Sequence, residues 1–110
     1  DKETNEMIGS IKFEKIDEIK KEAELGYFLR KDYWGQGLMT EVVRELVFLS
    51  FTKFDFKRLT IITHEENIAS QKVAMKAGFK LFRQFKGSDR YTRKMRDYTE
   101  YRYEKGDFNE

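Results

Sequence analysis

Two glycines separated by one residue, Gly35 and Gly37, constrain the fold of this chain more than any other feature. Residues 23–29 before them are largely apolar and strand-like, and residues 41–54 after them repeat apolar side chains at helical spacing. A strand, a glycine turn and a helix in this order expose the free N–H groups of a helix N-terminus, which attract anions. Without a Cβ, the turn can adopt positive φ and an anion can approach its backbone closely. The stretch predicts either an anion site or a simple chain reversal.

The segment after the helix places the glycine turn in a larger unit. Residues 58–63 are rich in β-branched side chains and predict another strand. A strand, a helix and a strand in succession form a βαβ unit, whose strands are parallel and joined by a right-handed crossover. Ligands of such sheets bind beyond the carboxyl ends of the strands, where the glycine turn lies. Residues 23–29 carry apolar side chains on both faces, so we expect this strand to be buried on both sides.

Five other segments show a pattern. Residues 7–16 predict a half-buried strand, residues 67–77 a second helix, and residues 79–85 and 98–104 two further strands. Residues 86–96, between these last two strands, predict a basic, mobile loop. Asn67 is a suitable N-cap for the second helix, and Gly78 a suitable residue to end it. Strands therefore flank the βαβ unit on both sides in the sequence.

Composition excludes several classes of protein. The 110 residues predict one domain, spanning residues 1–110. The 22 Lys and Arg against 20 Asp and Glu give a net charge of +2, which argues against bulk nucleic-acid binding. The absence of Cys excludes a disulfide framework, a thiolate nucleophile and a Cys-ligated metal, and we expect no metal. No apolar run is long enough to span a membrane and no signal sequence opens the chain, so we expect a cytoplasmic protein without a membrane partner.

Three motifs in sequence order then resemble a known family. They are Glu-Leu-Gly-Tyr-Phe-Leu-Arg at residues 24–30, Tyr-Trp-Gly-Gln-Gly at residues 33–37 followed by Glu41, and Asn67-x-x-Ser70-x-x-Val73-x-x-Lys76-x-Gly78-Phe79. Together they resemble the GNAT N-acetyltransferase superfamily, in particular its RimJ/RimL branch, which acetylates the N-termini of ribosomal proteins. The resemblance extends from about residue 8 to residue 85.

The resemblance implies the GNAT acyl-CoA N-acyltransferase fold, an α+β or α/β arrangement. Its sheet is mixed and mostly antiparallel, with a central parallel βαβ unit and helices on both faces. Family members usually carry a strand, two helices and another strand before the segment that corresponds to Met7. We therefore expect the chain to be an N-terminally truncated, partial domain without the strand and two helices that form much of the acceptor pocket.

The resemblance also implies acetyl-CoA (or coenzyme A) as the co-substrate. The positions that match the family's cofactor-binding residues are Tyr27, Leu29, Trp34, Gly35, Gln36, Gly37, Leu38, Met39, Thr40, Asn67 and Ser70. The N–H groups of residues 35–39 would hold the pyrophosphate, and the main chain of Tyr27 and Leu29 would contact the pantetheine arm. Met39 stands where the family usually has Gly or Ala, so its side chain either crowds the first helical turn or points away.

The implied reaction is direct transfer of an acetyl group to a primary amine, either a protein N-terminus such as that of a ribosomal protein or a small amine. Ser70 stands where relatives place a hydroxyl that protonates the leaving thiolate; a plain role in the first turn of its helix is the alternative. Glu24, His64, Glu65 and Glu66 are candidate general bases, since each falls near a strand end. Alternatively, Glu24 is a carboxylate that pairs with a neighbouring Lys or Arg side chain, and His64 is a solvated residue at a strand end.

Other readings of the chain stay open. A non-catalytic, CoA-binding GNAT-like module would share all three motifs. A basic run with interleaved tyrosines at residues 80–96 suits either a solvated face, an acidic acceptor or RNA, although nucleic acid is not the expected partner. The aromatic last strand is compatible with a monomer or a homodimer.

Overall fold

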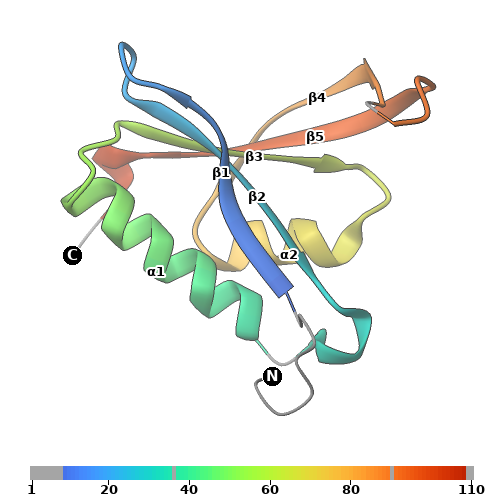
Figure 1. The fold of residues 1–110 in the computed structure, drawn as a ribbon, viewed down its shortest axis with the longest axis horizontal. Helices are drawn as coiled ribbons and strands as arrows, with labels where there is room; N and C mark the ends of the chain where they lie inside the picture. Colours follow the sequence, from blue (N-terminus) through green and yellow to red (C-terminus); the bar gives the residue numbers. More distant parts are fainter. Residues whose placement is uncertain (1–8, 36, 90, 109–110) are drawn as a thin grey trace.

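The computed structural model describes residues 9–35, 37–89 and 91–108. A five-stranded mixed sheet, in the order β1-β2-β3-β5-β4, packs against two helices (Figure 1). The elements are β1 (Gly9–Asp17), β2 (Glu22–Leu29), α1 (Leu38–Thr52), β3 (Arg58–His64), α2 (Ile68–Lys76), β4 (Lys80–Ser88) and β5 (Met95–Glu104), with single 3₁₀ turns at Lys31–Tyr33 and Lys105–Asp107. No helix in these described ranges is long and apolar enough to cross a membrane.

The central parallel pair is short. β2 and β3 are paired only from Glu22 opposite Arg58 to Leu25 opposite Ile61, whereas the other three strand pairs are antiparallel. Beyond this point β2 follows β1 and β3 follows β5, so the two strands diverge toward their carboxyl ends (Figure 1). The prediction of a mixed, mostly antiparallel sheet with a central parallel βαβ unit is confirmed.

One hydrophobic core joins the sheet to the helices. α1 buries Val43, Val47 and Phe51, which recur at helical spacing and face the sheet. Alternate residues of the central strands meet them: Ala23 and Leu25 from β2, and Leu59 and Ile61 from β3. Full burial of a side chain such as Phe51 contributes roughly 1.5–3 kcal/mol to the stability of the fold. These contacts fix α1 against the sheet, and they therefore also fix the position of the turn that precedes α1.

Both helices lie on the same face of the sheet, so the expectation of helices on both faces is wrong for the described residues (Figure 1). The Arg44 Nη2 atom of α1 donates a hydrogen bond to the carbonyl oxygen of Lys76 at the end of α2, over 2.8 Å. The opposite face carries charges, such as Arg58, which forms ion pairs with Glu22 and Glu104. Because that face carries charged side chains, the sheet has one apolar face, and both α1 and α2 pack against it.

Some predicted element properties also need correction. β2 is not buried on both sides, because Phe28 on its charged face is 48% exposed. The predicted loop at residues 86–96 is shorter, because β4 continues to Ser88 and β5 begins at Met95 opposite it. The Asp89 carboxylate accepts hydrogen bonds from the N–H groups of Tyr91 and Thr92, which closes a tight turn between the strands.

Candidate functional site

The glycine turn is built as the sequence predicts. Gly35 and Gly37 have φ angles of 80° and 74°, in the left-handed region that favours glycine, and Gly37 is the N-cap of α1. The first hydrogen bond of the helix runs from the Glu41 N–H to the Gly37 carbonyl oxygen, over 3.1 Å. Apart from the chain neighbours of each glycine, no atom of the described residues lies within 4 Å of a Cβ built on either one. The backbone of the turn is therefore open to a ligand.

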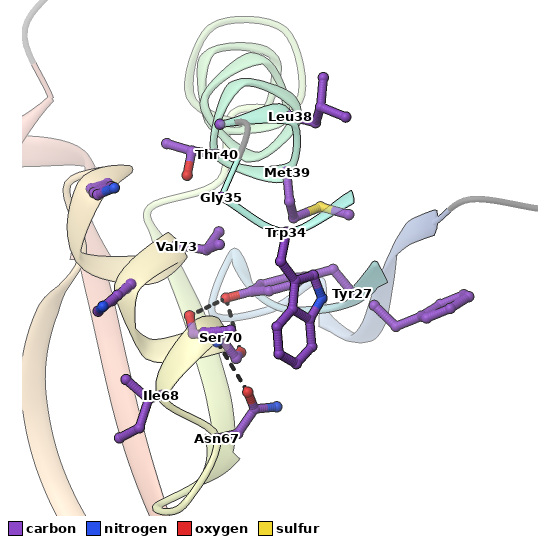
Figure 2. Close-up of a pocket in the computed structure, with 15 residues that line it drawn as sticks. Tyr27, Trp34, Gly35, Leu38, Met39, Thr40, Asn67, Ile68, Ser70 and Val73 are labelled. Atoms are coloured by element: carbon purple, nitrogen blue, oxygen red, sulfur yellow. Dashed lines mark hydrogen bonds between the residues drawn. The ribbon is translucent and has the colours of Figure 1, made fainter. Parts of the chain in front are cut away.

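A cavity of about 430 Å³, the donor cavity, extends from this turn to α2 (Figure 2). It brings together most of the predicted cofactor-binding residues: Tyr27, Trp34, Gly35, Gly37, Leu38, Met39, Thr40, Asn67 and Ser70. Leu29 ends β2 opposite Gly9, but its side chain and the whole of Gln36 lie outside the described residues. One cavity thus connects three segments that are distant in the sequence.

Met39 and Trp34 form different parts of the cavity wall. Met39 is 6% exposed and belongs to the hydrophobic core, so its side chain anchors the first turn of α1 (Figure 2). The polarisable, flexible thioether can pack there without a change in the helix. Trp34 is 46% exposed and lines the cavity beside Tyr27. Its indole can cover a bound ligand while it remains in contact with solvent.

Two hydroxyl groups meet in the donor cavity, where Tyr27 of β2 reaches Ser70 of α2 (Figure 2). The Tyr27 hydroxyl donates to the Ser70 carbonyl oxygen over 2.7 Å, and the Ser70 hydroxyl donates to the Tyr27 oxygen over 3.1 Å. Asn67 Oδ1 accepts a hydrogen bond from the Ser70 N–H over 3.1 Å, which caps α2. Burial raises the pKa of Tyr27 to about 12, although its hydrogen bond with Ser70 acts in the opposite direction. Tyr27 is therefore a neutral phenol at physiological pH.

A second hollow of about 590 Å³, the acceptor hollow, lies where β2 and β3 diverge. It shares Tyr27, Asn67 and Ser70 with the donor cavity. Its other lining residues include two of the four candidate bases, Glu24 and His64, whereas Glu65 and Glu66 line a separate hollow. The two hollows therefore meet at the hydroxyl pair, and this arrangement lets one ligand reach Ser70 from each side.

His64 is held by the hairpin between β4 and β5. Its ring stacks on Tyr98 with centroids 4.8 Å apart, and its Nε2 atom lies 3.6 Å from Asp89 Oδ2. Hydrogen bonds from the N–H groups of Thr92 and Tyr91 hold the pKa of Asp89 below its ordinary value. The Nδ1 atom of His64 is buried and has no hydrogen-bond partner among the described residues. The ionised Asp89 carboxylate thus lies beside the Nε2 edge of the imidazole ring.

The sequence patterns missed two residues of the site. Glu14 lies at a bulge in β1, between Phe13 and Lys15, and its side chain covers Gly26 so closely that a Cβ there would clash with the Glu14 carboxylate. A bulge re-aims a side chain, and simple alternation cannot reveal it. The other is Tyr27. Its main chain was predicted to contact the ligand, but no role was predicted for its side chain. Its alternation with Leu25 is the signal that places it toward the helices.

No cluster of three or more His, Cys, Asp or Glu side chains suited to a metal ion occurs in the part of the chain that the structure describes. The residues that line the two hollows offer hydroxyl, carboxylate, imidazole and backbone N–H groups. These groups suit proton transfer and anion binding.

Comparisons with known proteins agree with this geometry. Residues 1–80 match the model of the acetyltransferase (GNAT) domain family. The uncharacterised N-acetyltransferase p20 of Bacillus licheniformis is 36% identical over 78 residues, which are 71% of this chain and 44% of that protein. The ribosomal-protein-serine acetyltransferase of Escherichia coli (strain K12) is 32% identical over 75 residues, 68% of this chain and 42% of that protein.

Solved structures are similar over most of this chain. RimL, a ribosomal L7/L12 alpha-N-protein acetyltransferase in complex with coenzyme A, is 30% identical with a TM-score of 0.81; the match covers 91% of this chain and 56% of RimL. A ribosomal-protein-S5-alanine acetyltransferase from Vibrio fischeri shares the fold, with a TM-score of 0.87 at 22% identity over 100% of this chain and 61% of that one. The chain spans less than half the length of the two curated relatives. The chain belongs to the GNAT acetyltransferase domain family.

Proposed function

We propose that this chain carries the donor site and the reacting centre of an N-acetyltransferase that transfers an acetyl group directly from acetyl-CoA to a primary amine. The observation that carries this proposal is the junction of the donor cavity and the acceptor hollow at Ser70. Family membership and the coenzyme A bound to RimL support acetyl-CoA as the co-substrate. Acetyl transfer needs a donor and an acceptor to approach one point from different sides, which the junction allows.

The donor half of the proposal uses the glycine turn and the diverging strands. The N–H groups of Gly35, Gly37 and the first turn of α1 would hold the pyrophosphate, because they are open and lie at the positive end of the helix dipole. Beyond Leu25, β2 has no β3 partner, so its main chain at Tyr27 and Leu29 can bond to an extended ligand arm. Trp34 and Asn67 would enclose that arm.

Ser70 would supply the proton that the leaving group needs, and Tyr27 would hold Ser70 in position. The neutral amine nitrogen forms a bond to the acetyl carbon, the carbon–sulfur bond breaks, and the Ser70 hydroxyl gives its proton to the departing sulfur. Ser70 regains a proton, through water, from the one that the nitrogen loses as it becomes an amide. At rest that hydroxyl points to the Tyr27 oxygen, so Tyr27 holds Ser70 in place between the two hollows. The raised pKa of Tyr27 keeps its own proton on the phenol, where it donates to the Ser70 carbonyl oxygen.

The base would act from the acceptor hollow. Glu24 and His64 both line it, and either can take the proton of the attacking ammonium, directly or through water. Glu14 and Asp89 line the same hollow. Together with Glu24 they give it three carboxylates against one lysine, Lys15, and this excess of negative charge favours a cationic amine. The names of the relatives from Escherichia coli and of RimL make a protein N-terminus, such as that of a ribosomal protein, the first acceptor to test; a small amine is the second.

The test is release of free coenzyme A thiol by the purified 110-residue chain, with acetyl-CoA and a panel of N-terminal peptides and polyamines. We expect amine-dependent release, and a fall in kcat of about 10²-fold or more in Ser70→Ala, as for loss of a general acid. Thr52→Ala removes a hydroxyl at the far end of α1 and should keep full activity.

The outcomes separate the alternatives. Binding of acetyl-CoA without turnover of any amine would favour a non-catalytic, CoA-binding module. Absence of acetyl-CoA binding by the folded chain would contradict both readings. Activity in Ser70→Ala equal to that of the parent would remove Ser70 from the mechanism.

A further inference from the structure

The basic segment at residues 80–96 contains both paired and unpaired cations. Four of the described cations form ion pairs with carboxylates: Lys80 with Asp107, Arg83 with Glu100, Lys86 with Asp97, and Arg96 with Glu66. Arg93 and Lys94, in the turn between β4 and β5, are exposed and form no ion pair with a carboxylate of the described residues. Their charges are therefore available to a ligand.

The turn that carries these two cations lies at the rim of the acceptor hollow. The Asp89 N–H donates to the Lys94 carbonyl oxygen over 2.8 Å, and the Arg93 N–H donates to the Asp89 carbonyl oxygen over 2.8 Å. Asp89 and Tyr91 of the same turn line the hollow. The hairpin of β4 and β5 extends beyond the end of β3 (Figure 1). A ligand that is longer than the hollow can therefore reach Arg93 and Lys94.

Tyr91 presents an uncovered aromatic ring in this turn. The residue is 87% exposed, although its N–H donates to Asp89 Oδ1 over 2.8 Å and so fixes its main chain. In the same hairpin, the ring of Tyr98 stacks on both His64 and Phe85, whereas the Tyr91 ring stacks on no ring of the described residues. An exposed aromatic ring on a fixed main chain is typical of a surface that binds another protein.

Charge is divided between the interior and the rim of the acceptor hollow. The interior carries three carboxylates and one lysine, whereas the rim carries Arg93 and Lys94. An acceptor that matches both parts has a cation at its reacting end and anions farther along its chain. An extended peptide advances about 3.3–3.6 Å per residue, so residues at about positions three to six would lie at the rim when the N-terminal amine is inside.

We propose that Tyr91, Arg93 and Lys94 form an acceptor-docking surface, the hairpin tip, which selects protein N-termini that are followed by acidic residues. The inference rests on the proposed transfer to an amine, and it adds a class of acceptor that the reacting centre alone does not determine. RNA is the competing anionic ligand, but the carboxylates inside the hollow repel phosphates and favour an N-terminal ammonium group. The cations act far from the reacting atoms, so the selectivity should lie in KM rather than in kcat.

Two peptides with a free N-terminus test the hairpin tip in the whole chain with acetyl-CoA. They share their first residues and continue with a run of Asp in one peptide and a run of Lys in the other. We expect kcat/KM to be about tenfold higher for the acidic peptide, because two weak exposed ion pairs form with it and two repulsions arise with the other. This preference should decline with added salt.

The variant Arg93→Asn/Lys94→Gln removes both charges and keeps the turn. Arg93 has a φ of 61°, which Asn tolerates better than most side chains, so the variant should fold as the parent does. The ratio of the two kcat/KM values should fall to about one, through a higher KM for the acidic peptide. An undiminished preference in this variant, or equal kcat/KM values for the two peptides in the parent, would show that the hairpin tip does not select the acceptor.

Lys20→Gln/Lys21→Asn is the matched control, because it removes two exposed lysines from the turn between β1 and β2 (Figure 1). Lys21 also has a positive φ, 59°, and neither lysine lines the acceptor hollow. The control should retain the preference of the parent. An equal loss of preference in the control would mean that overall charge selects the peptide, and would overturn the role of the hairpin tip.

Fluorescence anisotropy of the same peptides, labelled at the carboxyl terminus, distinguishes failure of the hairpin tip from failure of the proposed function. Turnover without a charge preference leaves the proposed function intact and overturns the hairpin tip alone. Selective binding of the acidic peptide without turnover contradicts the proposed function and keeps the hairpin tip as a docking surface. If a single-stranded RNA displaces the acidic peptide at a lower concentration than the unlabelled peptide does, the cations bind nucleic acid and the inference is wrong.

Discussion

Gly37 combines two requirements at one residue. Its φ of 74° places it in the left-handed region, and its Cα borders the donor cavity. Because no atom of the described residues outside its chain neighbours lies within 4 Å of a Cβ built there, a side chain would meet a bound ligand rather than these parts of the protein. A β-branched residue would also be strained by about 1–3 kcal/mol.

Gly37→Val should therefore weaken coenzyme A binding by at least about tenfold and lower the melting temperature. Calorimetry and thermal melts measure the two effects separately. Gly37→Asn isolates the obstruction, because Asn tolerates positive φ better than Val; it should recover stability but not affinity. Gly106→Val is the control, since Gly106 also has open space around it but lies far from the cavity in the C-terminal 3₁₀ turn. Unchanged affinity in Gly37→Val would show that the turn does not hold the pyrophosphate.

The Tyr27 hydroxyl predicts a dependence of stability on alkaline pH. Burial raises its pKa to about 12 in the folded state, against about 10 in the unfolded chain. The folded state then binds more protons than the unfolded chain between these values, so stability falls as pH rises from 10 to 12. The loss should reach roughly 2–3 kcal/mol at pH 12, because each pKa unit corresponds to about 1.4 kcal/mol.

Urea unfolding at pH 9 to 12 tests this with Tyr27→Phe. As pH rises from 10 to 12, the unfolding free energy of the parent should fall by that amount relative to the unfolding free energy of Tyr27→Phe. Tyr91→Phe is the control, because Tyr91 is 87% exposed and its removal should leave the pH dependence of the parent intact. Parallel pH curves for the parent and Tyr27→Phe would show that the phenol titrates alike in both states.

At the scale of elements, α2 depends on Asn67 for its start. Asn67 Oδ1 accepts the Ser70 N–H, and the same turn of helix carries the Ser70 hydroxyl. Asn67→Ala should cost about 1 kcal/mol of stability, as loss of an N-cap does, and should loosen the hydroxyl pair. Thermal melts measure the first effect and kcat the second. Asn67→Asp keeps the cap and should retain most of the stability; a variant Asn67→Ala as stable as the parent would show that the cap contributes nothing.

Periodicity predicted the existence and type of each element, because alternation and helical spacing are local properties of the chain. It placed the start of the first helix at Glu41, whereas α1 starts at Leu38 because Gly37 at positive φ already acts as its cap. It treated residues 86–88 and 95–96 as loop, because these charged ends of the hairpin lack an apolar face and are held by pairing across strands instead. The bulge that aims Glu14 over Gly26 also depends on pairing, so no local pattern contains it.

At the scale of the molecule, the motifs predicted which residues line the donor cavity but not what lies on its other side. The acceptor hollow exists because β2 and β3 stop pairing at Leu25 and Ile61, and because the hairpin after β4 brings Asp89 to His64. Both depend on strand order and divergence, which arise only when distant segments assemble. The placement of α1 and α2 on one face has the same origin, since each helix alone is compatible with either face.

Binding of the donor should stabilise the whole fold, because the cavity joins β2, the turn before α1, and α2. A ligand that binds only the folded state at about 100 times its Kd adds about 2.7 kcal/mol to the free energy of unfolding. For a domain of this size, that corresponds to a rise of about 10 °C or more in Tm. Thermal melts with increasing acetyl-CoA measure the shift, and adenosine, which lacks all phosphates, should produce little. Saturating acetyl-CoA without a shift would mean that it does not bind the folded chain. A shift that persists undiminished in Gly37→Val would assign the binding energy to parts of the cavity other than the glycine turn.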